Sequence, residues 1–229
     1  MRVLLRILLV LAVPIVLSMG VVRLVTLPWY PAWEYGRSGF PEDPLGMPPD
    51  ERLRLARACV AFLNLPPGTV ELGDLRFSDG SVAFNGREIS HMDDVKRVYD
   101  RLTAIALFAF VIACVAGWFL GRRWGAATVW GALSDGGLTT LGVLIVLGAW
   151  MLLGFEAFFA AFHGVFFQED SWLFPYSDTL IRLFPLQLWQ DVGLIIVGGV
   201  GITAFVLALL GRALQKRYAL QKARVEEES

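Results

Sequence analysis

The sequence is poor in the residues that most often carry redox chemistry, metal binding or catalysis. It contains two cysteines, Cys59 and Cys114, and two histidines, His91 and His163. Two cysteines cannot form a disulfide framework, and there is no CxxC pair for metal or redox work. Cys114 lies in an apolar run and Cys59 in an expected helix, so we predict that both only contribute to packing.

Several common functional signatures are also absent. There is no GxSxG nucleophile elbow, HExxH zinc motif, Walker A loop or Rossmann glycine pattern. The chain has 20 Lys and Arg residues and 21 Asp and Glu residues. Its formal net charge is therefore -1, which gives no case for nucleic-acid binding. Any chemistry is therefore expected to depend on the histidines, without a metal or a cofactor.

Apolar residues, by contrast, are abundant: 56% of the chain is hydrophobic and its mean hydropathy is +0.58. This composition is too apolar for an ordinary soluble domain. A run of about 20 apolar residues can cross the hydrocarbon core of a bilayer, and four runs qualify. We therefore predict an all-α membrane core with spans at 1–27, 102–120, 138–162 and 192–210.

Basic residues next to the spans predict the orientation. They are Arg2, Arg6, Arg122, Arg123, Arg212, Lys216, Arg217, Lys222 and Arg224. All of them fall on one side if both termini are cytoplasmic. This arrangement makes 121–137 a cytoplasmic loop and 211–229 a cytoplasmic tail, with 28–101 and 163–191 outside. The first run is long and no small-residue cleavage site follows it, so we interpret it as a retained anchor.

Residues 28–101 are expected to form a small α+β insertion outside the membrane. Asp50 is expected to cap an amphipathic helix that ends near Asn64. Residues 75–77 and 82–84, separated by a Ser-Asp-Gly-Ser turn, indicate a β-hairpin. Ser90 is expected to cap a helix that continues into the second span, with His91 in its first turn. The loop 163–191 mixes Trp, Phe and Pro and is expected to lie on the membrane surface.

The two histidines are predicted to lie at the same outer depth of the bilayer. Imidazole exchanges a proton readily near neutral pH, so the pair could serve an acyl- or phosphoryl-transfer site. The alternative is that each only hydrogen-bonds to lipid headgroups, because two histidines placed at random would often share one side. Glu156, two turns below His163, is a further candidate, since an acid at that depth needs a partner or water.

Two blocks of the sequence resemble the hallmarks of a known family. The first is NGREISHMDDVK at 85–96; the second is FHGVFF at 162–167, with DSWLFP at 170–175 and LIRLFP at 180–185. They are similar to blocks of a bacterial family of four-span membrane proteins that includes the lipoprotein intramolecular transacylase. The resemblance maps the family's two functional histidines onto His91 and His163. It implies a multi-pass protein of the bacterial cytoplasmic membrane with its site at the outer leaflet.

The resemblance also implies the chemistry, an O-to-N acyl transfer within one diacylated lipoprotein partner held in membrane lipid. The free α-amine of its S-diacylglyceryl cysteine would attack the sn-2 ester and leave a lyso-form lipoprotein. We expect His163 to be the base, and His91 to stabilise the oxyanion or protonate the glycerol oxygen. Asn85 and Arg87 are expected to contact the ester, unless their turn only hydrogen-bonds to itself. The further candidates for substrate binding are Glu156 and Trp172.

Two other functions fit the same residues. The histidine pair could hydrolyse a lipid or lipoprotein ester, which would require a path for water and would release free fatty acid. The chain could also be a non-enzymatic envelope protein that binds a partner through its outer domain. Lipoprotein mass spectrometry after expression in a host that lacks N-acylation separates the three functions.

Overall fold

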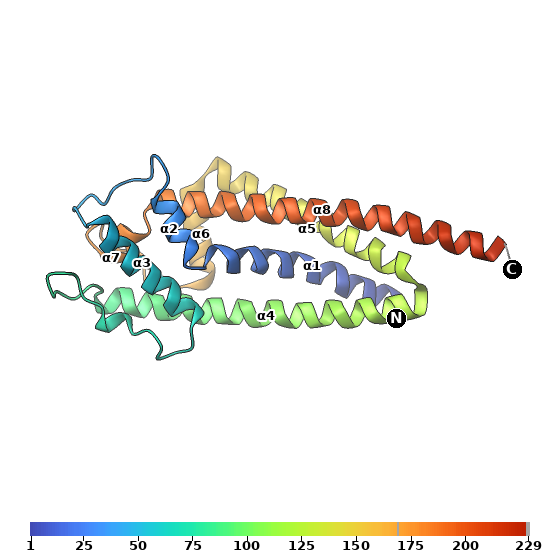
Figure 1. Cartoon of the computed structure of the whole chain (residues 1–229), viewed down its shortest axis with the longest axis horizontal. Coiled ribbons are helices and arrows are strands. Elements are labelled where there is room, and N and C mark those ends of the chain that lie inside the picture. The colour runs from blue at the N-terminus through green and yellow to red at the C-terminus, as the bar shows by residue number, and fades with distance from the viewer. Residues whose placement is uncertain (169, 228–229) are drawn as a thin grey trace. The chain divides into compact units, whose positions relative to one another are not determined.

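The computed structural model describes residues 1–168 and 170–227, and the chain in these ranges is built from helices (Figure 1). In chain order these are α1 (Arg2–Val25), α2 (Trp29–Tyr35), α3 (Pro49–Asn64), the 3₁₀ helix η1 (Leu72–Asp74), α4 (Gly86–Trp124), α5 (Ala126–Leu153), α6 (Phe155–Phe166), α7 (Thr179–Leu183) and α8 (Leu186–Glu227). Glu169, one of the acidic residues of the expected outer loop, and tail residues 228–229 lie outside the described residues.

The chain divides into two compact units. The first comprises Met1–Val21, Leu102–Leu153 and Ile196–Ser229; the second comprises Val22–Arg101 and Gly154–Ile195. Within the described chain, four helices are long and apolar enough to cross a membrane, namely α1, α4, α5 and α8. The predicted number of spans is therefore matched, and the helix that leads into the second span is continuous with it, since α4 is one helix of 39 residues.

The third expected span, 138–162, is not a single helix. α5 begins at Ala126 and ends at Leu153, and α6 begins at Phe155. Gly154 between them has φ -164° and ψ 74°, far from helical values, so the helical hydrogen bonds cannot continue through it. Most of the expected loop 121–137 is helical as well, because a single residue, Gly125 with φ +83°, separates α4 from α5. The prediction separated the second and third spans, but apolar length alone did not reveal the break at Gly154.

The α+β prediction for 28–101 was wrong, because the described residues contain no β-strand. The expected hairpin is reduced to one antiparallel bridge, between Arg76 and Val82. Its two backbone hydrogen bonds run from Phe77 N to Ser81 O (2.9 Å) and from Ala83 N to Leu75 O (3.0 Å). A two-stranded ribbon this short is marginal in water, and no third strand in the described chain extends it.

Two helix starts also differ from the prediction. α3 begins at Pro49, so Asp50 lies within its first turn instead of capping it. α4 begins at Gly86, which places Ser90 inside the helix and His91 in its second turn. The Asn85 side-chain oxygen accepts the backbone N–H of Glu88 (3.1 Å), and the Glu88 carboxylate accepts the N–H of Asn85 (2.8 Å). This reciprocal pair is a capping box, five residues before the one expected.

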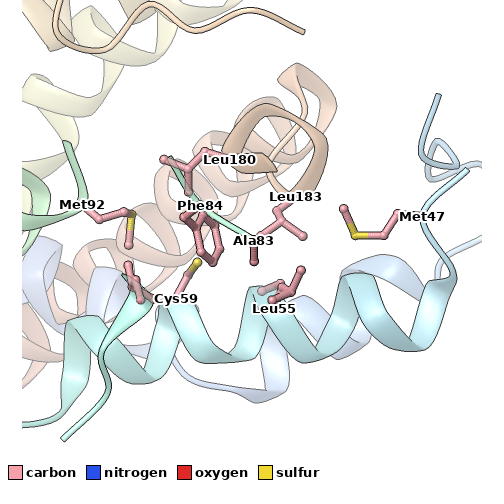
Figure 2. Packing of buried hydrophobic residues seen from close by; sticks show 10 residues of the cluster. Met47, Leu55, Cys59, Ala83, Phe84, Met92, Leu180 and Leu183 are labelled. Atoms are coloured by element: carbon pink, nitrogen blue, oxygen red, sulfur yellow. The ribbon is translucent and has the colours of Figure 1, made fainter. Parts of the chain in front are cut away.

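The second unit has its own apolar core, shown from close by in Figure 2. Leu55 and Cys59 of α3 pack with Phe84, which precedes α4, and with Leu180 and Leu183 of α7. Cys59 is 1% exposed, and burial raises the pKa of its thiol. It therefore stays a protonated packing residue, as predicted. This core packs the start of α4 together with α3 and α7.

Small residues bring the spans of the first unit close together. A Cβ added to Gly137 of α5 would lie 2.6 Å from the carbonyl oxygen of Ala204 and 3.0 Å from the backbone nitrogen of Ala208, both in α8. The Ser134 hydroxyl donates to the Ala208 carbonyl at 2.9 Å. Without a hydrophobic force between helices in lipid, such backbone approach and interhelical hydrogen bonding are the main sources of span packing.

Gly137→Ala is predicted to lower the stability of the folded chain by about 1–3 kcal/mol, because the new methyl group meets backbone atoms that cannot rotate away. The measurement is thermal unfolding in detergent micelles, followed by circular dichroism at 222 nm. Gly142→Ala is the matched control in the same helix, since nothing lies within 4 Å of its added Cβ. Equal midpoints for the two variants would show that this contact does not stabilise the unit.

Candidate active site

His163 lies in the last turn of α6, within the second unit. Its Nδ1 is 2.8 Å from the carbonyl oxygen of Phe159, four residues earlier. A carbonyl oxygen can only accept a hydrogen bond, so this contact requires the proton to be on Nδ1. In the neutral imidazole the lone pair is then on Nε2, which can accept a proton from a substrate.

Aromatic rings surround the His163 imidazole. Its ring centroid lies 4.1 Å from that of Phe159, 4.6 Å from that of Trp172 and 5.5 Å from that of Phe167. Burial lowers the pKa of His163 below its ordinary value, although the hydrogen bond to the Phe159 carbonyl opposes the shift. His163 is therefore neutral at neutral pH, the form that a general base requires.

His91 lies in the second turn of α4, three residues after the end of the capping box. Its ring centroid is 5.1 Å from that of Phe167 and 5.3 Å from that of Phe174. Its Nδ1 is buried and has no hydrogen-bond partner among the described residues. Burying an imidazolium without a partner is costly, so this environment favours the neutral ring. The second histidine is therefore uncharged but is not held in one tautomer by a bond at Nδ1.

The two histidines meet at a single side chain, since both imidazoles contact the ring of Phe167. They come from α4 and from α6, and lie 72 positions apart in the sequence, yet both belong to the second unit. Phe167 directly follows α6, and its backbone N–H donates to the His163 carbonyl at 2.8 Å. The aromatic segment after α6 therefore supplies the surface on which the two rings come together.

Asn85 and Arg87, both predicted to contact the ester, differ in where their side chains lie. The Asn85 side-chain oxygen accepts the backbone N–H groups of Arg87 (3.0 Å) and Glu88 (3.1 Å), so it serves as a helix cap. The Arg87 side chain is 56% exposed and lies over the ring of Phe174 at 5.4 Å, with Asp178 at 3.4 Å. Because Phe174 also contacts His91, Arg87 borders the histidine pair, whereas the Asn85 side chain is turned to its own backbone.

The other two candidates also differ in position. Trp172 lies against His163 and, at 6.1 Å, against Phe159, so it is part of the same aromatic cluster. Glu156 is exposed in the first turn of α6 and forms no hydrogen bond or ion pair with any described residue. The structure therefore brings Trp172 into direct contact with His163, and Glu156 has no hydrogen bond or ion pair with either histidine in the described chain.

Three residues of this region were missed as site residues. Phe167 and Phe174 contact His91 directly, and Glu88 anchors the helix on which His91 lies. The many aromatic residues at 158–167 could have indicated Phe167. The Asn-x-x-Glu spacing at 85–88 is a recognisable capping signal and could have indicated Glu88. Phe174 lies in the block at 170–175, but its contact with His91 depends on how the loop folds back.

Known proteins share this architecture. The sequence model of the family described as lipoprotein intramolecular transacylase Lit matches residues 5–189. An uncharacterized protein of Aquifex aeolicus (strain VF5) is 34% identical over 219 residues, which cover 95% of this chain and 97% of the relative. The match to the family model includes both blocks that carry the histidines.

Solved structures agree in fold. The membrane integral lipoprotein intramolecular transacylase Lit from Bacillus cereus superposes with a TM-score of 0.75 at 20% identity, covering 95% of this chain and 97% of that one. A histidine-to-arginine variant of the same protein gives a TM-score of 0.70 at 18% identity, covering 99% of this chain and 95% of that one. With its four apolar helices, this chain is a multi-pass membrane protein. It belongs to the lipoprotein intramolecular transacylase (Lit) family, and it is accordingly an acyltransferase.

Proposed function

We propose that this transacylase moves the sn-2 acyl chain of a diacylated lipoprotein onto the free α-amine of the same molecule. The amine of the S-diacylglyceryl cysteine attacks the ester carbonyl, a carbon–nitrogen bond forms, and the carbon–oxygen bond to glycerol breaks. The amine loses a proton and the glycerol oxygen gains one, which leaves an N-acyl, lyso-form lipoprotein. The observation that carries this proposal is that the imidazoles of His91 and His163 both contact the ring of Phe167.

His163 is the general base of the proposed reaction. Its Nδ1–H is committed to the Phe159 carbonyl, so Nε2 is the ring atom with a free lone pair. Nε2 takes the proton that the amine nitrogen loses as it forms the bond to the ester carbonyl carbon. The hydrogen bond also limits rotation of the ring, so the basic nitrogen needs little reorganisation when the substrate binds.

His91 is the partner that acts at the oxygen atoms. A neutral imidazole can donate one N–H, either to the oxyanion of the tetrahedral intermediate or to the departing glycerol oxygen. Its Nδ1 has no partner among the described residues, so no bond there dictates its tautomer. This freedom suits a group that donates a proton in one step and recovers it in another.

The aromatic surroundings favour transfer over hydrolysis. Phe159, Phe167 and Trp172 pack against His163, and Phe174 packs against His91. Apolar rings exclude water, which is the competing nucleophile in an ester hydrolase. Because amine and ester belong to one molecule, holding them in register supplies much of the rate enhancement.

The proposed setting is the outer leaflet of the bacterial cytoplasmic membrane, with both termini in the cytoplasm. The basic residues at the start of α1 (Arg2 and Arg6), at the end of α4 (Arg122 and Arg123) and in the last part of α8 support this orientation. In this orientation residues 28–101 and 163–191 face outward, where the ester and the amine of a membrane-anchored lipoprotein lie.

His91→Ala and His163→Ala are each predicted to lower conversion to the lyso form by about 10²–10⁴-fold, the usual contribution of a positioned acid–base group. Groups that act as a unit are not additive, so the double variant should be barely slower than either single one. The measurement is mass spectrometry of the N-terminal lipopeptide of a reporter lipoprotein, expressed in a host without N-acylation.

Cys59→Ala and Cys114→Ala are the controls for this experiment, because neither thiol lies at the histidines. Both should convert the reporter at nearly the wild-type rate, with the membrane abundance of every variant checked by immunoblot. Near-normal conversion by either histidine variant would overturn the two-histidine site. Release of free fatty acid in place of lyso lipoprotein would instead identify a hydrolase.

The orientation is tested with single cysteines in a Cys59→Ala, Cys114→Ala background. Ser81→Cys in the second unit should react with a membrane-impermeant maleimide in intact cells, and Gln221→Cys in α8 should react only after the cells are opened. Both side chains are exposed, so a lack of reaction reports the membrane and not burial. Labelling of residue 221 in intact cells would reverse the proposed topology.

Purified activity is predicted to survive EDTA. A catalytic zinc site usually needs three protein ligands, and the described residues contain no group of three His, Cys, Asp or Glu side chains placed to hold a metal ion. Conversion of a lipopeptide substrate would be compared before and after dialysis against the chelator. Loss of activity that added zinc restores would contradict a mechanism based on the two imidazoles alone.

A further inference from the structure

Glu88 is a buried carboxylate for which the proposed chemistry has no use. It is 1% exposed and lies three residues before His91 on α4. Within the described residues no arginine or lysine forms an ion pair with it. Burying a carboxylate without a cation is costly unless hydrogen-bond donors compensate it, so its partners should explain why it is there.

The two oxygens of Glu88 hold two different parts of the chain. Oε2 accepts the N–H of Asn85 at 2.8 Å and closes the capping box of α4. Oε1 accepts the N–H of Leu180, in the first turn of α7, at 2.7 Å. Asp178, at the N-cap of α7, makes no side-chain cap hydrogen bond, so Glu88 provides a capping acceptor from another helix.

Other bonds hold the rest of α7. The Thr179 hydroxyl donates to the Ala83 carbonyl at 2.5 Å. At the far end, the Arg52 guanidinium donates to the Arg182 carbonyl and the Tyr35 hydroxyl to the Leu183 carbonyl. Figure 2 shows Leu180 and Leu183 turned towards Phe84, which lies just before α4. The hydrogen bond of Glu88 to Leu180 therefore joins the backbone of α7 to the capped end of the His91 helix, beside the ion pair of Arg87 with Asp178.

The segment between α6 and α7 carries the aromatic surface of the site. One end is fixed by Phe167, whose N–H bonds to the His163 carbonyl, and the other end runs into α7. Phe167 and Phe174 lie in this segment and contact His91, and Trp172 contacts His163. Because this segment runs directly into α7, a shift of α7 relative to the start of α4 would move Phe174 relative to His91.

We propose that Glu88 is a positioning residue of the transacylase site, holding the His91 helix in place against the aromatic residues Phe167, Trp172 and Phe174. It touches neither imidazole in the described contacts and acts through the backbone of α4 and α7. The inference rests on the proposed function, since register matters for rate only if both histidines act on one substrate. A displacement of about 1 Å can cost an enzyme about 10²-fold in rate, so a shared cap can control turnover without meeting the substrate.

Glu88→Gln tests the proposal with a side chain of the same shape. An amide has one accepting oxygen, and its NH₂ group would face one of the two backbone N–H donors, so either α4 or α7 loses its cap. The full-length chain, purified in detergent, is assayed with a synthetic S-diacylglyceryl lipopeptide, and the product is quantified by mass spectrometry. We expect kcat per folded molecule to fall by about 10–100-fold, with a smaller change in KM, because the displaced groups act on the reacting atoms.

Glu51→Gln is the matched control. Glu51 is also a buried carboxylate of the second unit, but it accepts the N–H and the hydroxyl of Ser78, both at 2.6 Å, and pairs with Arg54 at 3.5 Å, away from the histidines. Like Glu88→Gln, the Glu51→Gln substitution weakens hydrogen bonds of a buried carboxylate, but it should leave kcat within about twofold of the wild type. An equal fall in kcat for both variants would show a general effect of losing a buried carboxylate and would overturn the proposal.

A double-mutant cycle with Phe174→Ala separates positioning from a purely structural role. If Glu88 acts through the aromatic segment, Glu88→Gln should add little to Phe174→Ala, whereas independent effects multiply. Unchanged kcat in Glu88→Gln, or strict multiplication with Phe174→Ala, overturns the proposal. If the glutamine variant does not accumulate, Glu88→Asp replaces it, because a side chain shorter by one methylene cannot reach both donors. Failure of both to fold would assign Glu88 to folding alone, which also overturns it.

Failure of this inference can be told apart from failure of the proposed function. Wild-type enzyme is assayed on the same lipopeptide in every experiment. If the wild type forms no N-acyl product, the proposed function fails, whatever Glu88 does. If the wild type is active and Glu88→Gln is equally active per folded molecule, only the positioning role is lost.

Discussion

Hydrocarbon offers backbone N–H and C=O groups no hydrogen-bond partner, and the arrangement of this chain follows from that constraint. The spans of α1, α4, α5 and α8 satisfy their own backbone bonds. The polar side chains between them are paired as well: Ser134 donates to the Ala208 carbonyl, and Asp135 forms ion pairs with Arg6 and Arg212. The helices are interrupted at Gly125 and Gly154, where the backbone leaves helical values.

Scarcity of water shapes the candidate site in the same way. Both imidazoles lie among aromatic rings, where a charged ring is poorly solvated, so the neutral forms are favoured. A neutral pair can offer a lone pair and an N–H at the same time, as acyl transfer between an amine and an ester requires. The two differ because the Phe159 carbonyl holds the proton of His163 on Nδ1, whereas Nδ1 of His91 has no such partner in the described chain. Identical side chains thereby acquire different chemistry.

Much of the fold could be predicted from the sequence, and the errors have a common cause. The four spans and the continuity of the outer helix with the second span follow from apolar length, which is a local property. The hairpin at 75–84 also looked convincing locally, but two segments of three residues bury little without a third strand, and the chain there packs against α3 instead. Gly154 is one glycine among several in an apolar run, and nothing local shows that the helix ends there.

By itself the sequence determined the membrane-spanning character of the chain, the two histidine blocks and, through the resemblance of those blocks, the family. Hydrophobic length and short motifs are encoded in adjacent residues, so they can be read without a structure. Only the tertiary structure decided that both imidazoles contact Phe167, that the Asn85 side chain caps a helix, and that Glu88 holds α7 by the N–H of Leu180. Each of these depends on which donor or ring a side chain meets after the chain has folded back, and residues far apart in sequence carry no local mark of that meeting.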